Sequence, residues 1–395
     1  MKLLFITPSL SYPPSKGYEV MLLKLMENLA SRHSIDLVMF SSDPAITEFK
    51  AIEDICNSVR IIYLSKWQSL INVCKGLISK DPLQVRYYRS KKMTDLINQL
   101  LLDNNYDAAI FTLIRTAQFL PDWYKGTKIL NMIDPLILNY ERSLKWRPWY
   151  LRLPIKQEVS RLLEYEAANI NRFDSTTLIS KADIIDYQSL MNSPNTEWVP
   201  YGIDINRFQS DKNITREKGM IVITGNMGYA PNVDGVIYFC QKIFPAILEQ
   251  EPEAHLWLVG INPTLKIKEL ATNKNITVTG YVEDVKYYLN RAMVSVCPIR
   301  LGVGTQTKVL EAMSMGTPVV TTSEGNHGIC GVSGLDLFVA DSPKEIADKV
   351  VNLLRANNWN KLSDNGRKFV IENFNWSVSS NKFECILNTS KKCVK

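Results

Sequence analysis

A lysine and a glutamate one helical turn apart, Lys308 and Glu311, are the residues of this chain best suited to hold a ligand. Side chains three positions apart lie on the same face of a helix. The ammonium group of Lys308 can pair with a phosphate, and the Glu311 carboxylate can accept hydrogen bonds from sugar hydroxyls. A phosphate donor beside a diol acceptor suits a nucleotide, and more specifically a nucleotide sugar.

A glycine loop leads into this pair. Gly302 and Gly304 let the backbone approach a ligand closely. The residues that join the loop to Lys308 are polar: Thr305, Gln306 and Thr307. We predict a helix that starts near Lys308, whose first turn offers unbonded N–H groups and the positive end of the helix dipole. The alternative is a capped loop that carries two surface charges.

Short β-type runs alternate with helical patterns along the whole chain, which favours parallel sheets built from βαβ units. The predicted strands are 3–7, 35–40, 59–64, 108–112, 128–132, 176–179, 220–224, 254–259, 276–279, 293–297, 318–322 and 337–339. The predicted helices include 158–171, 233–247, 284–290, 308–314 and 344–357. A loop ending at Gly17, followed by a helix, also fits the carboxyl edge of the first sheet.

The segment WVPYGIDINRF, at 198–208, separates two such series. We therefore predict an α/β protein with two doubly wound, Rossmann-like parallel-sheet domains that face a cleft. The first domain covers 1–200 and the second 201–375. The tail, 376–395, has helical periodicity and is expected to cross back to the first domain. Such a pair of domains suits a two-substrate transfer from which closure excludes water.

Composition limits the partners of this 395-residue chain. Apolar residues make up 46% and charged residues 22%, as in a globular protein. The net charge of +6 is mild and is shared by both halves, so no nucleic-acid partner is expected. The cysteines are scattered and histidines are few, which argues against a metal site and fits reduced thiols in the cytoplasm. No apolar run reaches the roughly 18 residues of a membrane span.

Two segments combine basic and aromatic residues. Seven basic groups and one acid, Asp81, lie within 66–92, and the segment 143–156 (SLKWRPWYLRLPIK) contains no acid. Basic groups interleaved with Trp and Tyr suit an anionic membrane surface. We expect peripheral contact at the inner face of the membrane, and the alternative is a solvated face with aromatic anchors in the core.

Several tracts together resemble the retaining family 4 glycosyltransferases of the GT-B fold, in the branch associated with exopolysaccharide synthesis. The tract GTQTKVLEAMSMGTPVVTT, which contains Lys308 and Glu311, resembles the donor-binding segment of that family. The supporting tracts are ITGNMGYAPNVDGVIYF at 223–239, VTGYVEDVKYYLNRAMVSVCPIR at 278–300, VPYGIDINRF, NMIDPLILNYERS at 131–143 and LLEYEAANINRFDSTTLIS at 162–180. The similarity covers most of the chain from 131 to 376.

The resemblance implies roles for individual residues. Lys308 would contact the donor diphosphate, and Glu311 the ribose hydroxyls. Tyr281 and Val282 would lie at the base, and Gly17 would admit the donor phosphate or the acceptor from the first domain. The other expected donor-site residues are Gly225, Asn226, Gly228, Arg300, Gly304, Thr305, Gln306 and Thr307.

The chain also departs from the family pattern. Where a first carboxylate often precedes the second by eight positions, this chain has Val303. The loop GNMGYAPN lacks the Arg and Lys found in many members, which leaves Lys308 and Arg300 to neutralise phosphate. In the first domain, Asp134 follows a predicted strand and is our candidate to orient an acceptor hydroxyl or the donor sugar. The alternative is an Asp that caps the turn at Pro135.

The resemblance implies a hexosyltransferase that moves a sugar from a nucleotide diphosphate sugar to a glycan or lipid-linked acceptor in surface polysaccharide synthesis. Retention of configuration is expected. The chain has no D-x-D motif, so no cofactor and no metal clamp are expected. The alternatives are a nucleotide-sugar epimerase of the same fold, which needs no acceptor, and a non-catalytic nucleotide- or glycan-binding protein.

Overall fold

The structure is a computed structural model that describes residues 1–45, 52–144, 147–191, 193, 195–211, 214–301, 304–356 and 360–393. The chain divides into two compact units. Unit 1 combines Met1–Pro200 with Trp376–Lys395, and unit 2 is Tyr201–Asn375. Each unit contains one parallel sheet with its own helices and core.

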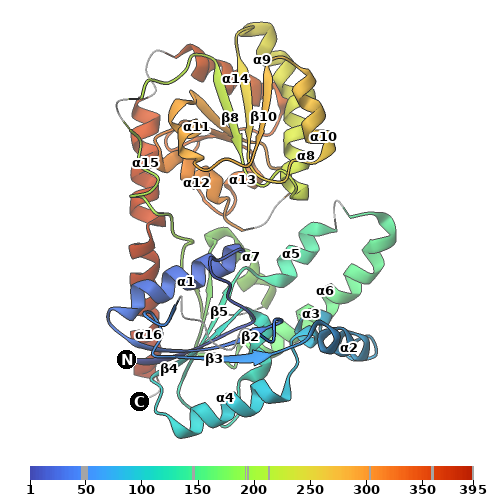
Figure 1. Ribbon diagram of the computed structural model, residues 1–395, viewed down its shortest axis with the longest axis vertical. Helices are drawn as coiled ribbons and strands as arrows, with labels where there is room; N and C mark the ends of the chain where they lie inside the picture. The colour runs from blue at the N-terminus through green and yellow to red at the C-terminus, as the bar shows by residue number, and fades with distance from the viewer. Residues whose placement is uncertain are drawn as a thin grey trace. The chain divides into compact units, whose positions relative to one another are not determined.

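Unit 1 is built on a seven-stranded parallel sheet of order β3-β2-β1-β4-β5-β6-β7 (Figure 1). The chain proceeds outward from β1 to β3, returns to the other side of β1 with β4, and proceeds outward again. The central strands read as continuous apolar runs, as expected when both faces of a sheet are covered. The strands are β1 (Lys2–Thr7), β2 (Ser34–Ser41), β3 (Ser58–Tyr63), β4 (Ala108–Thr112), β5 (Thr127–Ile133), β6 (Ser175–Leu178) and β7 (Thr196–Trp198).

The helices of unit 1 include the tail of the chain, which packs against α1 and β5. Phe5 and Phe111 are among the side chains buried between the helices and the sheet. The helices are α1 (Gly17–Ala30), α2 (Lys66–Gly76), α3 (Leu83–Tyr87), α4 (Lys91–Asp103), a 3-10 helix (Ile114–Phe119), α5 (Leu136–Ser143), α6 (Trp149–Ile170), α7 (Lys181–Met191) and α16 (Trp376–Cys393).

Unit 2 repeats the plan with a six-stranded parallel sheet of order β10-β9-β8-β11-β12-β13. Its first strand, β8, is buried at every position, and its partners β9 and β11 lie on opposite sides of it. The direction in which strands are added to the sheet therefore reverses between β8 and β11. The strands are β8 (Met220–Thr224), β9 (His255–Val259), β10 (Ile276–Gly280), β11 (Val294–Cys297), β12 (Val319–Thr321) and β13 (Phe338–Val339).

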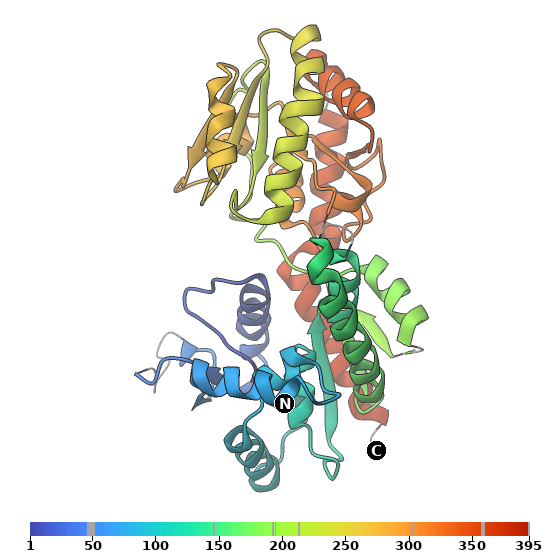
Figure 2. The same ribbon diagram turned by 90° about the vertical axis from the view of Figure 1, so that its right-hand side faces the viewer.

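Helices lie on both sides of the strands of unit 2 (Figure 2). Phe239 and Phe244 are fully buried at the junction of the first two helices, which are joined by a π-helical turn. The helices are α8 (Ala230–Tyr238), the π-helical turn (Phe239–Ile243), α9 (Phe244–Gln250), α10 (Leu265–Glu269), a 3-10 turn (Leu270–Thr272), α11 (Lys286–Arg291), α12 (Thr307–Ser314), α13 (Ser323–Asn326), α14 (Pro343–Arg355) and α15 (Asn360–Phe374).

The predicted parallel α/β architecture is confirmed, but two local predictions need correction. The helix predicted over 158–171 begins at Trp149, because the basic and aromatic residues before Glu158 continue the helix even with Pro154 inside it. The short strand β7 is absent from the predicted set, since three residues carry too little pattern to be recognised. No helix within the described ranges has the length and apolar character needed to cross a bilayer.

Candidate functional site

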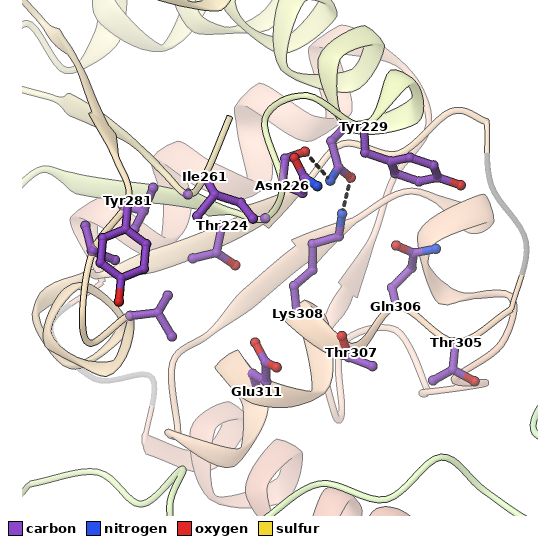
Figure 3. Close-up of a pocket in the computed structure, with 16 residues that line it drawn as sticks. Thr224, Asn226, Tyr229, Ile261, Tyr281, Thr305, Gln306, Thr307, Lys308 and Glu311 are labelled. Carbon is purple, nitrogen blue, oxygen red and sulfur yellow. Dashed lines mark hydrogen bonds between the residues drawn. The ribbon is translucent and has the colours of Figure 1, made fainter. Parts of the chain in front are cut away.

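A pocket of about 440 Å³ lies in unit 2, where β8, β9 and β10 end and α12 begins (Figure 3). In a doubly wound sheet, ligands bind outside the carboxyl ends of the strands at the point where the strand order reverses. The end of β8 is at that point. Of the residues proposed from sequence, the pocket is lined by Gly225, Asn226, Tyr281, Val282, Thr305, Gln306, Thr307, Lys308 and Glu311.

One face of helix α12 is anchored in the core, which fixes the position of its amino end at the pocket. Val309, Leu310 and Met313 are almost completely buried. Lys308 and Glu311 of the same helix are only partly buried and line the pocket. Among the described residues, no side chain caps the start of this helix. A negatively charged ligand group would therefore meet the positive end of the helix dipole together with the Lys308 ammonium.

A small hydrogen-bond network positions Lys308. Its Nζ donates to Asn232 Oδ1 over 2.5 Å, and Asn232 Nδ2 donates to the main-chain oxygen of Asn226 over 2.9 Å (Figure 3). Lys308 is thereby held toward the loop that follows β8. The sequence analysis misses Asn232, although a polar residue in the first turn after a strand and a glycine loop is a recognisable signal.

Two glycines that line the pocket bring the ends of β8 and β9 close together. Gly225 has φ +145° and Gly260 has φ +152°, both in the region that glycine alone adopts readily. A Cβ on Gly260 would lie 1.7 Å from the carbonyl oxygen of Gly225, so no side chain fits there. Gly260 is not among the predicted site residues, because an isolated glycine after a strand is a weak signal.

The Glu311 carboxyl lies in a surrounding that disfavours its charge. Burial raises its pKa to about 6, and the nearby cations Arg207 and Lys308 oppose this effect only in part. Burial and the Glu311 charge raise the pKa of Tyr201 in turn. Neither Arg207 nor Tyr201 is among the residues predicted for the site. Both follow the domain boundary in sequence, where no local pattern relates them to α12.

Replacing Glu311 with Gln should stabilise the protein and weaken nucleotide binding. The folded-state pKa lies above the usual value of 4.5, so ionisation of Glu311 opposes folding above pH 6, and this penalty disappears below pH 4.5. At pH 7.5 we expect Glu311→Gln to raise the free energy of unfolding by about 1–2 kcal/mol. Denaturant titrations of both proteins at pH 7.5 and pH 4 test this.

The same substitution removes the charged group that the sequence analysis assigns to the ribose hydroxyls. We expect nucleotide affinity at pH 7.5 to fall by roughly 10- to 100-fold, the value of a hydrogen bond to a charged group. Calorimetric titration with a nucleoside diphosphate measures this. Unchanged affinity, with or without the gain in stability, would contradict the role of Glu311.

Three predicted donor-site residues of unit 2 are not among those that line the pocket. The guanidinium of Arg300 donates to both carboxylate oxygens of Asp234, at 2.7 and 3.1 Å, and lies over the ring of Tyr238. The amide of Gly228 donates to Asn226 Oδ1 over 2.9 Å, which closes the loop after β8. Gly304 adopts φ +70°. The predictions for Gly302 and Val303 lie outside the described residues.

In unit 1, Gly17 is the first residue of α1. A Cβ at this position would meet no atom of the described residues within 4 Å. The loop before it is held by Glu19, which is 1% exposed and accepts hydrogen bonds from Ser9 and Ser11. Burial would raise the pKa of Glu19, but these hydrogen bonds, the Ser15 amide and Lys16 outweigh burial and lower it to about 2. The carboxylate is therefore charged at neutral pH and fixes the loop.

Gly17→Ala separates a structural role of this glycine from a role in ligand access. The added methyl group has room and suits a helix, so the free energy of unfolding should stay the same or rise by up to about 1 kcal/mol. If a substrate approaches this backbone segment, kcat/KM should fall by about 10- to 100-fold. Steady-state kinetics beside thermal unfolding measures both. Full activity would remove Gly17 from the proposed site.

Asp134 follows β5 and is partly buried, with its Oδ1 shielded from solvent. Burial and the charge of Asp183 raise its pKa to about 7, and Arg142 counteracts this. Its Oδ1 has no hydrogen-bond partner among the described residues. Arg142 forms ion pairs with two other carboxylates, those of Asp183 at 2.7 Å and Asp186 at 2.9 Å. A carboxyl group with a pKa near neutrality can accept or donate a proton at physiological pH.

The chain has two Rossmann-like units, as in the GT-B fold, and a pocket at the switch point of the second sheet. Comparison with known proteins agrees. Residues 218–356 match the family of glycosyl transferases group 1. The matched segment covers most of unit 2 and contains both Lys308 and Glu311.

Relatives and solved structures match along nearly the whole chain. An uncharacterized 44.6 kDa protein in the cps region of Klebsiella pneumoniae is 22% identical, covering 94% of this chain and 96% of its own. An uncharacterized glycosyltransferase of Methanocaldococcus jannaschii is 28% identical, covering 97% of each chain. The structure of Anabaena HepE in complex with UDP superposes with a TM-score of 0.69 at 14% identity, covering 98% of this chain and 100% of that one. These findings support a glycosyltransferase of the GT-B fold.

Proposed function

We propose that the protein transfers a hexose-type sugar from a nucleotide diphosphate sugar to a glycan or lipid-linked acceptor in surface polysaccharide synthesis, with retention of configuration. The observation that carries this proposal is the placement of Lys308 and Glu311 in one pocket, one helical turn apart. The Anabaena protein that superposes on this chain has also been solved with UDP-glucose, and the Klebsiella relative is named for a cps region.

In this proposal the donor lies across the carboxyl ends of β8, β9 and β10. Lys308 exchanges Asn232 for the diphosphate, which also meets the amino end of α12. Glu311 accepts hydrogen bonds from the ribose hydroxyls. Tyr281, which is 73% exposed, and Val282 lie beside the base at the end of β10. Positive groups aimed at the leaving diphosphate lower the barrier because they stabilise the charge that develops there.

The acceptor attacks the anomeric carbon on the face that the nucleotide leaves. The bond between the sugar and the diphosphate breaks while the new glycosidic bond forms, and the departing phosphate accepts the acceptor's proton. Asp134 orients the acceptor hydroxyl or a hydroxyl of the donor sugar. We propose that no divalent metal takes part, since Lys308 and the helix dipole supply the positive charge that a metal clamp would supply.

We place the reaction in the cytoplasm at the inner face of the membrane, where a nucleotide sugar and a lipid-linked acceptor can meet. The basic and aromatic segments of unit 1 are the parts of the chain that suit this peripheral contact. Lys145 and Trp146 of the second segment lie outside the described residues.

Thermal stabilisation by UDP, GDP, ADP and TDP, and then by their sugars, identifies the donor, because a bound ligand raises stability by mass action. The best donor is then incubated with polysaccharide acceptors in EDTA, while nucleoside diphosphate release and the anomeric configuration of the product are followed. We expect acceptor-dependent release and a retained configuration. Turnover of the sugar without an acceptor would indicate an epimerase, and binding without release would indicate a non-catalytic protein.

A further inference from the structure

Two neighbouring helices of unit 1 expose large apolar side chains. On α2 and just after it, Trp67 is 77% exposed and Ile78 94%. On the first turns of α6, Trp149 is 81% exposed and Leu153 77%. The two helices are neighbours, because Arg161 of α6 donates a hydrogen bond to the main-chain oxygen of Leu77 over 2.9 Å. We call these four exposed side chains the apolar rim.

A second feature is a pocket of about 440 Å³ with a strongly cationic lining, which we call the cationic pocket. Arg89, Lys91 and Lys92 line it, and none of the described residues in its lining is acidic. The pocket also includes Ser65 and Ser90, whose side chains cap the starts of α2 and α4. The pocket thus combines three cations with the positive ends of two helix dipoles.

Arg89 has a partner in Asp81, but the described residues of the lining include no acid to offset Lys91 and Lys92. Lysines in a first helical turn oppose the dipole, and neither α2 nor α4 has an acid in its first turn. Asp81, the one acid of segment 66–92, is already paired with Arg86 at 2.8 Å and with Arg89 at 3.0 Å. Where a natural protein departs from the preference for acids in the first turn of a helix, a functional site is one expected reason.

A third feature, an apolar pocket of about 460 Å³, lies between the helices of the apolar rim. Its walls combine Val73 of α2 and Leu83 of α3 with Pro154 and Ile155 of α6. Glu158 also lines this pocket, and its Oε1 accepts a hydrogen bond from the main-chain N–H of Gln84 over 3.3 Å. Burial raises the pKa of Glu158, and Arg161, 3.9 Å from its Oε2, opposes this effect.

All three features include residues of α2 or its cap. We propose that they form one surface of unit 1, the docking face, which binds an anionic lipid bilayer. A lipid phosphate occupies the cationic pocket, a hydrocarbon chain enters the apolar pocket, and the apolar rim inserts into the headgroup boundary. A membrane fits because it alone presents dense negative charge and hydrocarbon on one surface. A free phosphate would leave the apolar rim in water. The inference rests on the membrane contact that the proposed function includes, and assigns it to residues.

Vesicle co-sedimentation of the full chain tests the docking face. We expect binding to phosphatidylglycerol vesicles, weak binding to phosphatidylcholine vesicles, and loss of binding in high salt. The variant Lys91→Ala/Lys92→Ala should bind about 25-fold more weakly, or about fivefold for each lysine. Trp149→Ser/Leu153→Ser should bind at least roughly tenfold more weakly. Leu265→Ser, at a residue of α10 that is 76% exposed, is the matched control and should bind normally.

Bromine-labelled acyl chains test insertion directly. They should quench tryptophan fluorescence in the wild type, and Trp149→Phe should remove much of the quenching. Equal binding to both vesicle types, or wild-type binding by both double variants, would overturn the proposal. If millimolar inorganic phosphate binds in the cationic pocket while vesicles do not bind, the pocket is a site for a free anion and the proposal is overturned. Binding only to vesicles that carry a lipid-linked acceptor would also overturn it.

The outcome is separable from the proposed sugar transfer. Donor turnover with a water-soluble acceptor should be unchanged in the two double variants, since their residues neither line the donor pocket nor contact Asp134. If vesicles fail to bind while turnover is intact, only the proposal of the docking face is contradicted. If vesicles bind but there is no turnover, only the proposal of sugar transfer is contradicted.

Discussion

Replacing Lys308 with Ala should lower kcat/KM for the sugar donor by about 30- to 900-fold, which corresponds to about 2–4 kcal/mol of lost stabilisation. Its Nζ is the positive group in the pocket nearest the start of α12, and its present partner, Asn232, is neutral and easily exchanged. The loss should fall mainly on kcat, because the leaving diphosphate gains charge in the transition state. Steady-state release of nucleoside diphosphate measures it.

Two variants control for this result. Lys308→Arg keeps the charge and should recover part of the activity. Lys368→Ala removes an exposed lysine of α15 that pairs with Glu372, and its kinetics should match the wild type. Near-normal turnover in Lys308→Ala would contradict the assignment of α12 to the donor diphosphate, whatever its effect on stability.

Replacing Gly260 with Ala should strongly destabilise unit 2. The new Cβ would lie 1.7 Å from the carbonyl oxygen of Gly225, at a φ of +152° that side chains rarely adopt. Backbone strain and overpacking together should cost about 2–5 kcal/mol of the free energy of unfolding. Nucleotide affinity should fall as well, because the displaced Gly225 lines the pocket. Denaturant titration and nucleotide binding measure the two effects.

Gly280→Ala is the matched control for this substitution. Gly280 ends β10 with φ +71°, but an added Cβ meets no atom of the described residues within 4 Å. Only the backbone strain applies, at about 1–2 kcal/mol. The difference between the two variants isolates the contact between the β8 and β9 ends. If Gly260→Ala proved as stable as Gly280→Ala, the close approach of these two strands would not hold in solution.

The fold can be predicted in detail because each strand is a compact apolar run bounded by polar residues. The strands predicted over 108–112 and 220–224 have the bounds that the structure gives, and the other ten predicted strands agree within one residue at either end. The predicted start of α6 is wrong because its amphipathic pattern begins only near Glu158, whereas its first turns expose Trp149 and Leu153. A helix whose apolar side chains are exposed does not show the periodic apolar pattern from which helices are predicted.

The candidate site can be predicted where its residues are contiguous in sequence. Thr305, Gln306, Thr307, Lys308 and Glu311 belong to one tract, and all of them line the pocket. Asn232 and Gly260 cannot be found in this way, since their roles depend on which strand ends lie side by side. Arg300 illustrates the reverse case, because its position beside the donor loop suggests phosphate, whereas the structure pairs it with Asp234.

The most direct test of the proposed donor site is a crystal structure of the full chain with the nucleoside diphosphate that stabilises it most. We predict diphosphate oxygens within hydrogen-bond distance of Lys308 Nζ, a broken Lys308–Asn232 bond, and ribose hydroxyls on the Glu311 carboxylate. A nucleotide bound away from α12, or one whose phosphates leave the Lys308–Asn232 bond in place, would contradict this assignment.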